Sequence, residues 1–144
     1  MGHAPLGTGV PLSSLEESEK ELSPRAVLIL DDEPSICVLL AEMLQSTGHP
    51  VLAAGSVEEA MSHLRMRSVA VVVVDVQLAG ADGIAFLQQA LDIDNRLLGI
   101  VMTGHGNIEL AVRAMKSGAA DFLTKPFQVE LVRRSVSRLL ELYR

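Results

Sequence analysis

Five residues of this chain have side chains that could do chemistry together if the fold brings them to one place. Asp31, Asp32 and Asp75 supply carboxylates, Thr103 supplies a hydroxyl and Lys125 supplies an ammonium group. Carboxylates in a small space repel one another, so they need a cation or raised pKa values to coexist. Oxygen ligands without His or Cys favour a hard divalent ion, in the first place Mg²⁺, with Mn²⁺ as a substitute.

The same residue types suit the transfer of a phosphoryl group. A lysine ammonium and a hydroxyl donor can bind the phosphoryl oxygens that a metal ion leaves uncovered. Asp75 is the best placed nucleophile because it emerges directly from the valine-rich segment 69–74. A carboxylate that attacks phosphorus forms an acyl phosphate.

Each of these residues follows a short apolar segment that predicts a β-strand. The predicted strands are residues 26–30, 51–54, 69–74, 97–102 and 120–123. Between and after them, apolar residues at helical spacing predict five helices. The residues that mark these helices are Ile36, Leu39, Leu40, Met43 and Leu44; Val57, Ala60, Met61 and Leu64; Ile84, Leu87 and Leu91; Ile108, Ala111, Val112 and Met115; and Val132, Val136, Leu139 and Leu140. Ser56 and Glu59 have the spacing of a capping box at the start of the second helix.

This alternation predicts an α/β fold, a doubly wound parallel sheet of five strands with five helices on its two faces, in three layers α/β/α. The continuous run 69–74 is typical of a central strand that is covered on both faces. In such a sheet, ligands bind beyond the carboxyl ends of the strands. We therefore expect the five polar residues to meet at one rim of the sheet.

Taken one at a time, the five residues also have simpler interpretations. Asp31 and Asp32 could cap the helix that follows them. Thr103 could be a turn residue, and Lys125 could be a solvated loop lysine. Asp75 is harder to explain in this way, because an acid at the end of a buried strand must be solvated or paired. Since the groups follow separate strands, we interpret them as one site.

The composition indicates one ordinary globular domain with an N-terminal arm. The 144 residues are 49% hydrophobic and 21% charged, which suffices for a full core. Residues 1–14 are rich in Gly, Pro and Ser, and residues 15–22 could form a turn or two of helix that Pro24 ends. We expect residues 1–24 to be a disordered arm and residues 25–144 to form the domain.

Composition also excludes several classes of protein. A single cysteine, Cys37, rules out an intramolecular disulfide and a cysteine-built zinc site, and we expect it to serve packing. The net charge of −6 argues against direct contact with nucleic acid. The longest apolar run is far too short to span a membrane, and the start of the chain has no leader pattern. These features predict a cytoplasmic domain without a membrane partner.

At this point the motifs show a family resemblance. Residues 25–144 resemble the receiver domain of two-component response regulators. The motifs that carry the resemblance are DDEP at 31–34, VVVVDV at 71–76, VMTGHGN at 101–107 and DFLTKPF at 121–127. Residues 101–127 resemble most the receivers of nitrogen-regulation-type or nitrogen-fixation-type transcriptional regulators. The resemblance implies the flavodoxin-like strand order 2-1-3-4-5.

The resemblance also implies a role for each acidic residue. Asp75 would be the phosphoacceptor that takes the phosphoryl group from a histidine kinase or a phosphotransfer protein. Asp32 and Asp75 would ligate Mg²⁺ directly, Asp31 would help through water, and the backbone carbonyl of Gln77 would complete the set. Apart from its own phosphorylation and dephosphorylation, such a domain is not an enzyme.

Four further implications concern the response to phosphorylation. Thr103 would donate a hydrogen bond to a phosphoryl oxygen, and Lys125 would form an ion pair with the phosphoryl group. The bond between Lys125 and Pro126 would be cis. Phe122 would be the aromatic switch residue, although it could also be an ordinary core aromatic. The surface of the fourth helix, fifth strand and fifth helix would then act on an output domain or effector that controls transcription. Phosphorylation could also lead two copies of the domain to form a homodimer.

The chain departs from the family pattern at a few positions. Ala79 stands where many relatives have Pro, so we expect a looser loop after Asp75. Gln77 and His105 occupy positions at which the family varies the lifetime of the phosphoryl group. A stand-alone receiver and a piece of a longer regulator both remain open.

Three other functions share part of this pattern. A receiver that is not phosphorylated and acts as an interaction module would not need the intact set of site residues. A phosphatase of the haloacid dehalogenase type needs a second Asp two residues after the nucleophile, where this chain has Gln77. A flavin or dinucleotide site is disfavoured because no G-x-G-x-x-G motif follows the first strand.

Overall fold

The computed structural model describes residues 24–104 and 107–143. Two expectations lie outside these residues: the arm up to residue 23, and the role of His105. The described elements alternate between strands and helices. They are β1 (Ala26–Leu30), α2 (Pro34–Leu44), the short 3₁₀ helix η2 (Gln45–Thr47), β2 (Val51–Ala54), α3 (Val57–Met66), β3 (Val69–Asp75), β4 (Gln77–Leu78), β5 (Ala81–Asp82), α4 (Gly83–Ile93), β6 (Leu98–Thr103), α5 (Ile108–Lys116), β7 (Asp121–Thr124) and α6 (Val129–Tyr143).

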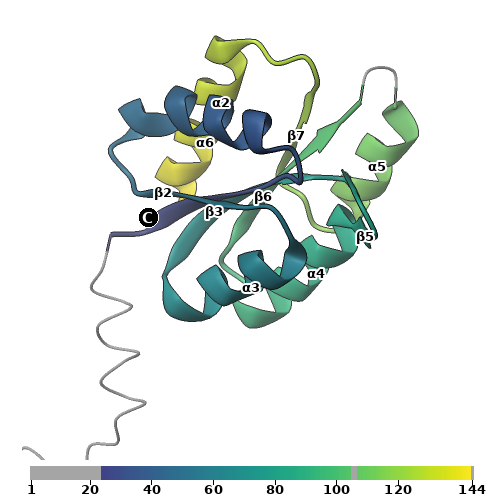
Figure 1. Cartoon of the computed structure of the whole chain (residues 1–144), viewed down its shortest axis with the longest axis horizontal. Coiled ribbons are helices and arrows are strands. Elements are labelled where there is room, and N and C mark those ends of the chain that lie inside the picture. The colour runs from purple at the N-terminus through teal and green to yellow at the C-terminus, as the bar shows by residue number, and fades with distance from the viewer. Residues whose placement is uncertain (1–23, 105–106, 144) are drawn as a thin grey trace, which may run out of the picture.

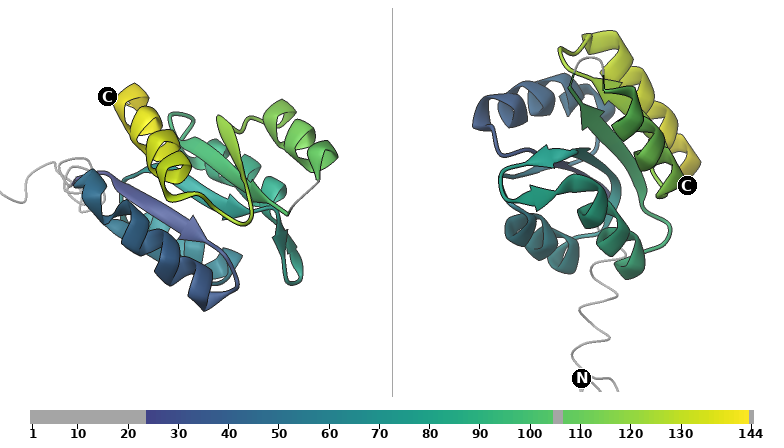
Figure 2. Two further views of the ribbon diagram at one scale, coloured as in Figure 1. Left: turned by 90° about the horizontal axis from the view of Figure 1, so that it is seen from above. Right: turned by 90° about the vertical axis from the view of Figure 1, so that its right-hand side faces the viewer.

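The main sheet has five parallel strands in the order β2-β1-β3-β6-β7. Helices α2 and α6 cover one face, and α3, α4 and α5 cover the other (Figures 1 and 2). This arrangement confirms the predicted three-layer α/β fold and the strand order 2-1-3-4-5. No helix in residues 24–104 and 107–143 combines the length and apolar character that crossing a membrane requires.

Two apolar cores lie on the two faces of the sheet. Successive residues of a strand point to opposite faces, so β1 contributes Leu28 and Leu30 to one core and Val27 and Ile29 to the other. All seven residues of β3 are buried. This explains why residues 69–74 are apolar without alternation, since a central strand has no face toward water.

The predicted start of α3 is confirmed, with one difference in its cap. The Ser56 hydroxyl accepts a hydrogen bond from the Glu59 amide at 3.2 Å. The Glu59 carboxylate accepts from the amide of Gly55 at 2.7 Å, one residue before the position that a reciprocal capping box uses. The cap therefore extends to the loop between β2 and α3.

The apolar residues of α5 do not all face the core. Ala111 and Ala114 are buried, whereas Ile108, Val112 and Met115 are 75%, 47% and 42% exposed. The small alanine side chains bring the helix close to the sheet. Because β7 is the edge strand, no further helix among residues 24–104 and 107–143 covers the remaining apolar residues of α5. The helical spacing of the apolar residues predicted α5, but it could not show how many of these residues pack against the sheet and how many remain exposed.

A two-stranded hairpin that the sequence analysis did not predict follows β3. Strands β4 and β5 have two residues each and pair antiparallel, with Gln77 opposite Asp82 and Leu78 opposite Ala81. Such short strands carry no periodic signal. In the left view of Figure 2 the hairpin projects in teal from the body of the domain.

Gly83 allows helix α4 to begin directly against the end of β3. Its amide donates to the Val76 carbonyl at 3.0 Å. A Cβ atom at this position would overlap the backbone carbonyl of Asp75 and touch Val76. Since both neighbours are backbone atoms, they cannot give way by changing a rotamer.

We expect the substitution Gly83→Ala to lower the free energy of unfolding by about 3 kcal/mol, because the backbone must shift to relieve the overlap. Urea unfolding followed by circular dichroism measures this loss. The control is Gly55→Ala, where a Cβ meets only a Glu59 side-chain oxygen at 3.9 Å and the expected change is below about 0.5 kcal/mol. Equal stability of the two variants would contradict the argument.

Candidate functional site

The three predicted carboxylates meet at the carboxyl ends of β1 and β3. One oxygen from each of Asp31, Asp32 and Asp75 lies within 4.8 Å of the other two. Asp31 is fully buried, and Asp75, the last residue of β3, is 8% exposed. Adjacent parallel strands bring these residues together, as the sequence predicted.

Lys125 reaches the same cluster from the loop after β7. Its Nζ atom lies 2.9 Å from an oxygen of Asp31 and 2.9 Å from an oxygen of Asp75. Its amide donates to the Thr103 carbonyl at 2.9 Å, and the bond to Pro126 is cis, the isomer that the resemblance implied. Lys125 is therefore part of the cluster and not a free loop lysine.

The electrostatic balance at Lys125 favours its charged form. Burial works to lower the pKa of the ammonium, but the hydrogen bonds to Asp75 and Asp31, together with their negative charges, raise it above its ordinary value. The protonated ammonium of Lys125 therefore stabilises the folded state. This contribution to the free energy of unfolding is fully present below the ordinary lysine pKa of about 10.4, and it is lost as the pH rises through the higher pKa of Lys125 in the folded protein. The ion pairs are therefore intact at neutral pH.

Backbone amides from the loops hold the other carboxylate oxygens. Asp31 accepts from the Glu33 amide at 2.9 Å, Asp75 accepts from the Gln77 amide at 2.9 Å, and Asp32 accepts from the Ala79 amide at 2.7 Å. The expected looser loop after Asp75 is therefore a hairpin tied to Asp32. The sequence gives little sign of these bonds, because almost every residue type has a backbone amide.

The capping interpretation of Asp31 and Asp32 is wrong. The N-cap residue of α2 is Glu33, no side chain in the described part of the chain caps the helix, and Pro34 stands in its first turn. Proline lacks an amide hydrogen, so the first residue of the helix has no N–H group that needs a partner. The two carboxylates are thus turned to the site instead of the helix.

The charge and the donor atoms of the cluster fit a hard divalent cation. Three carboxylates face one ammonium group, which leaves excess negative charge in a largely buried place. Their oxygens come from two separate strand ends, and oxygen ligands in such a group suit Mg²⁺. The Gln77 carbonyl remains a predicted ligand.

Thr103 ends β6 beside the cluster with its hydroxyl buried. The residue is 2% exposed, and among the described residues its Oγ1 atom has no hydrogen-bond partner. Leaving a buried hydroxyl without a partner costs free energy. An incoming acceptor oxygen would relieve this cost.

Phe122 is not a core aromatic. It is 42% exposed and lines a largely apolar groove of about 400 Å³ between α5 and β7. Thr103, Ile108, Val112 and Met115 line the same groove. The groove therefore runs from the exposed apolar face of α5 to the residue that borders the acidic cluster.

Cys37 is buried, as a packing role requires. Its thiol donates to the Asp31 carbonyl at 3.3 Å. Burial, followed by the negative charge of Asp31, raises the pKa of the thiol above its ordinary value. The thiol therefore stays protonated and unreactive at neutral pH.

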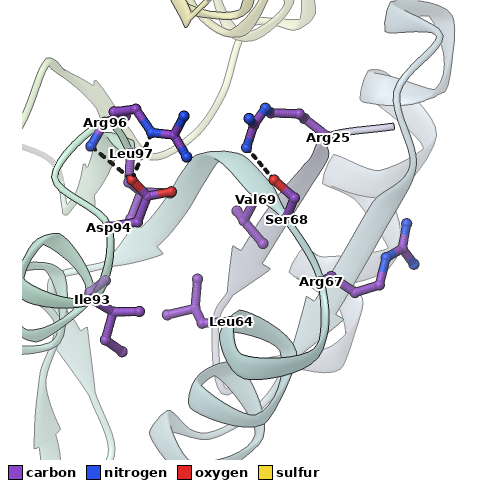
Figure 3. A pocket seen from close by; sticks show the side chains of 10 residues that line it. Arg25, Leu64, Arg67, Ser68, Val69, Ile93, Asp94, Arg96 and Leu97 are labelled. Carbon is purple, nitrogen blue, oxygen red and sulfur yellow. Dashed lines mark hydrogen bonds and ion pairs between the residues drawn. The ribbon is translucent and has the colours of Figure 1, made fainter. Parts of the chain in front are cut away.

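A separate pocket of about 310 Å³ lies at the opposite end of the sheet, where β1, β3 and β6 begin. Figure 3 shows Arg25 bonded to Ser68, and Arg96 bonded to Asp94, at its border. None of the residues predicted to do chemistry lines this pocket. The acidic cluster, at the end of the sheet where doubly wound folds bind ligands, is the candidate site.

Comparisons with known proteins agree with this fold. The family description "Response regulator receiver domain" matches residues 27–137. The chain is 37% identical over 118 residues to the C4-dicarboxylate transport transcriptional regulatory protein DctD of Pseudomonas aeruginosa, covering 82% of this chain and 26% of the relative. It is 34% identical over 120 residues to the nitrogen assimilation regulatory protein NtrX of Azorhizobium caulinodans, again covering 82% and 26%. The chain thus spans about a quarter of the length of these relatives.

Two solved receiver domains have the same fold as this chain over nearly their whole length. The receiver domain of NtrX from Brucella abortus superimposes with a TM-score of 0.76 at 35% identity, covering 80% of this chain and 98% of that one. The beryllofluoride-activated NtrC4 receiver domain dimer has a TM-score of 0.77 at 34% identity, covering 83% and 98%. These neighbours support the resemblance to nitrogen-regulation-type receivers. The chain belongs to the family of receiver domains of two-component response regulators.

Proposed function

We propose that this domain accepts a phosphoryl group on Asp75 from the phosphohistidine of a histidine kinase or a phosphotransfer protein, in a reaction that depends on Mg²⁺. The observation that supports this most directly is the meeting of Asp31, Asp32 and Asp75 with Lys125 at one rim of the sheet. The family membership supports the same function.

In the proposed reaction, a carboxylate oxygen of Asp75 attacks the phosphorus atom. A new P–O bond forms and the P–N bond to the histidine breaks, with its electron pair left on the imidazole ring. The product is an acyl phosphate. When bound, Mg²⁺ would supply positive charge that offsets the charges of the carboxylates and the phosphoryl oxygens. Asp31, Asp32, Asp75 and the carbonyl of Gln77 would hold it.

Two residues would bind the transferred group. Lys125 already lies 2.9 Å from Asp75 and would pair with the phosphoryl oxygens. The Thr103 hydroxyl, which has no partner among the described residues, would donate to one of them. Lys125 would exchange part of its bonding with Asp31 and Asp75 for bonding with the new group.

Movement of Thr103 would carry the signal to the groove beside Phe122. Thr103 lines this groove, so its displacement changes the space available to the exposed Phe122 ring. Phosphorylation would then bias two conformations of the surface formed by α5, β7 and α6. An output domain or effector, or a second copy of the domain, would bind this surface.

The names of the relatives point to control of transcription, and the NtrC4 structure is a receiver dimer. As part of the proposal, this domain would control transcription, would form a homodimer when phosphorylated and would be located in the cytoplasm. The domain would act on no substrate other than its own phosphoryl group. An interaction module without phosphorylation is the alternative, and the mass measurement below separates the two.

Incubation with Mg²⁺ and acetyl phosphate should add the mass of one phosphoryl group to the protein, as seen by intact mass spectrometry. The gain should vanish in Asp75→Asn and when Mg²⁺ is removed, because the nucleophile or the cation is then missing. Asp82→Asn is the matched control: Asp82 caps α4 nearby and should not be needed. A wild-type protein that gains no mass would favour the interaction module.

The substitution Asp32→Asn should stabilise the metal-free protein by about 1 kcal/mol, because one of three crowded negative charges is removed while Asp31 and Asp75 keep Lys125. Thermal unfolding in EDTA should show a rise of about 4 °C. Addition of MgCl₂ should raise the melting temperature of the wild type more than that of the variant. A variant that melts below the wild type in EDTA would contradict this account of the charges.

The substitution Thr103→Val should stabilise the unphosphorylated protein by about 1 kcal/mol, because it removes a buried hydroxyl that has no hydrogen-bond partner among the described residues. Thr103→Ser keeps the hydroxyl and should give no such gain. On phosphorylation, the NMR signals of the Phe122 ring should shift in the wild type and in Thr103→Ser, but much less in Thr103→Val. Equal shifts of the Phe122 signals in all three proteins would show that the Thr103 hydroxyl does not transmit the effect of phosphorylation to Phe122.

A further inference from the structure

The tip of the β4–β5 hairpin contacts the acidic cluster through a backbone amide. The Ala79 amide donates to Oδ2 of Asp32 at 2.7 Å, across 47 positions of sequence. This distance is at the short end of the range for hydrogen bonds from N–H groups to a charged carboxylate. Ala79 itself is exposed, so the contribution of the residue to the site is its N–H group and not its side chain.

The geometry of this turn would accept a proline at position 79. Leu78 pairs with Ala81, so Ala79 and Gly80 form a two-residue turn. Gly80 has a φ angle of +73°, and no residue other than glycine has a positive φ in the described part of the chain. This is the pattern of a type II turn, in which proline is favoured at the first central position. Leu78 is extended, as the residue before a proline must be.

Asp32 depends on this amide more than the other two carboxylates depend on theirs. Lys125 lies 2.9 Å from Asp31 and from Asp75, and these are its two ion pairs among the described residues. The hydrogen bond described for Asp32 comes from Ala79 alone. This N–H group holds Oδ2 of Asp32 in place and leaves Oδ1 of Asp32 available to a cation.

We propose that Ala79 is a positioning residue for the metal: its N–H group orients the Asp32 carboxylate and so strengthens the binding of Mg²⁺. The proposal rests on the proposed function, since it assumes that the cluster binds the cation. A carboxylate that is already oriented loses less conformational freedom on binding. Partners that orient metal ligands typically contribute about 10-fold to 100-fold in metal affinity.

The test is the affinity for Mg²⁺ of the full chain, measured by titration with MgCl₂ and followed by amide NMR shifts. Ala79→Pro removes the N–H group from a turn that accepts proline, and should weaken binding about tenfold. Ala79→Ser keeps the N–H group and should stay within about twofold of the wild type. In EDTA, Ala79→Pro should still unfold cooperatively but should melt below the wild type, because the loss of the hydrogen bond to Asp32 outweighs the restriction of the unfolded chain by proline.

A double-mutant cycle with Asp32→Ala shows whether Ala79 acts through Asp32. In the Asp32→Ala background, Ala79→Pro should have no further effect on the Mg²⁺ affinity. Equal affinity of the wild type and Ala79→Pro would overturn the inference and leave the proposed function intact. A wild type that binds no Mg²⁺ would instead overturn the proposed function.

A second measurement decides the matter even if Ala79→Pro does not fold. The Ala79 amide hydrogen should exchange slowly with solvent in the wild type, although the residue is exposed, because it is bonded to Asp32. In Asp32→Ala its exchange should become at least tenfold faster, while amides in the centre of β3 should not change. Unchanged exchange at Ala79 would show that the hydrogen bond does not hold Asp32.

Discussion

Repulsion between three carboxylates in one small volume is the constraint on which the rest of this domain depends. Asp31 is fully buried, so its charge must be compensated inside the protein. Lys125 does this for Asp31 and Asp75 together, but only if β7 lies in the same sheet and its following loop turns back over the strand ends. The strand order thus determines which ion pairs can form.

Lys125 neutralises only part of the negative charge of the three carboxylates. Backbone amides from the neighbouring loops donate hydrogen bonds to the carboxylate oxygens. Glu33, Gln77 and Ala79 each direct an N–H group at one carboxylate. This places the β4–β5 hairpin against the cluster and requires α4 to start immediately behind it. Gly83 permits that start, since any side chain there would overlap the backbone of Asp75.

The site and the outer surface share one residue. Thr103 borders the carboxylates at the end of β6, and it also lines the groove that contains Phe122 and the exposed apolar residues of α5. Those residues are uncovered because α5 packs through Ala111 and Ala114 beside an edge strand. A change in charge at the cluster therefore has a short physical route to an apolar surface where a partner could bind.

The sequence alone determined the five parallel strands, their helices and the residues at the strand ends, because each follows from local patterns: strand length, helical spacing and the position of a polar residue after an apolar run. It did not determine the exposed position of Phe122, the amide of Ala79 at Asp32 or the close approach at Gly83. These depend on which segments become neighbours across the fold, and on backbone groups that nearly every residue type possesses. Only the tertiary structure could decide them, since contacts between distant segments leave no periodic signal in the chain.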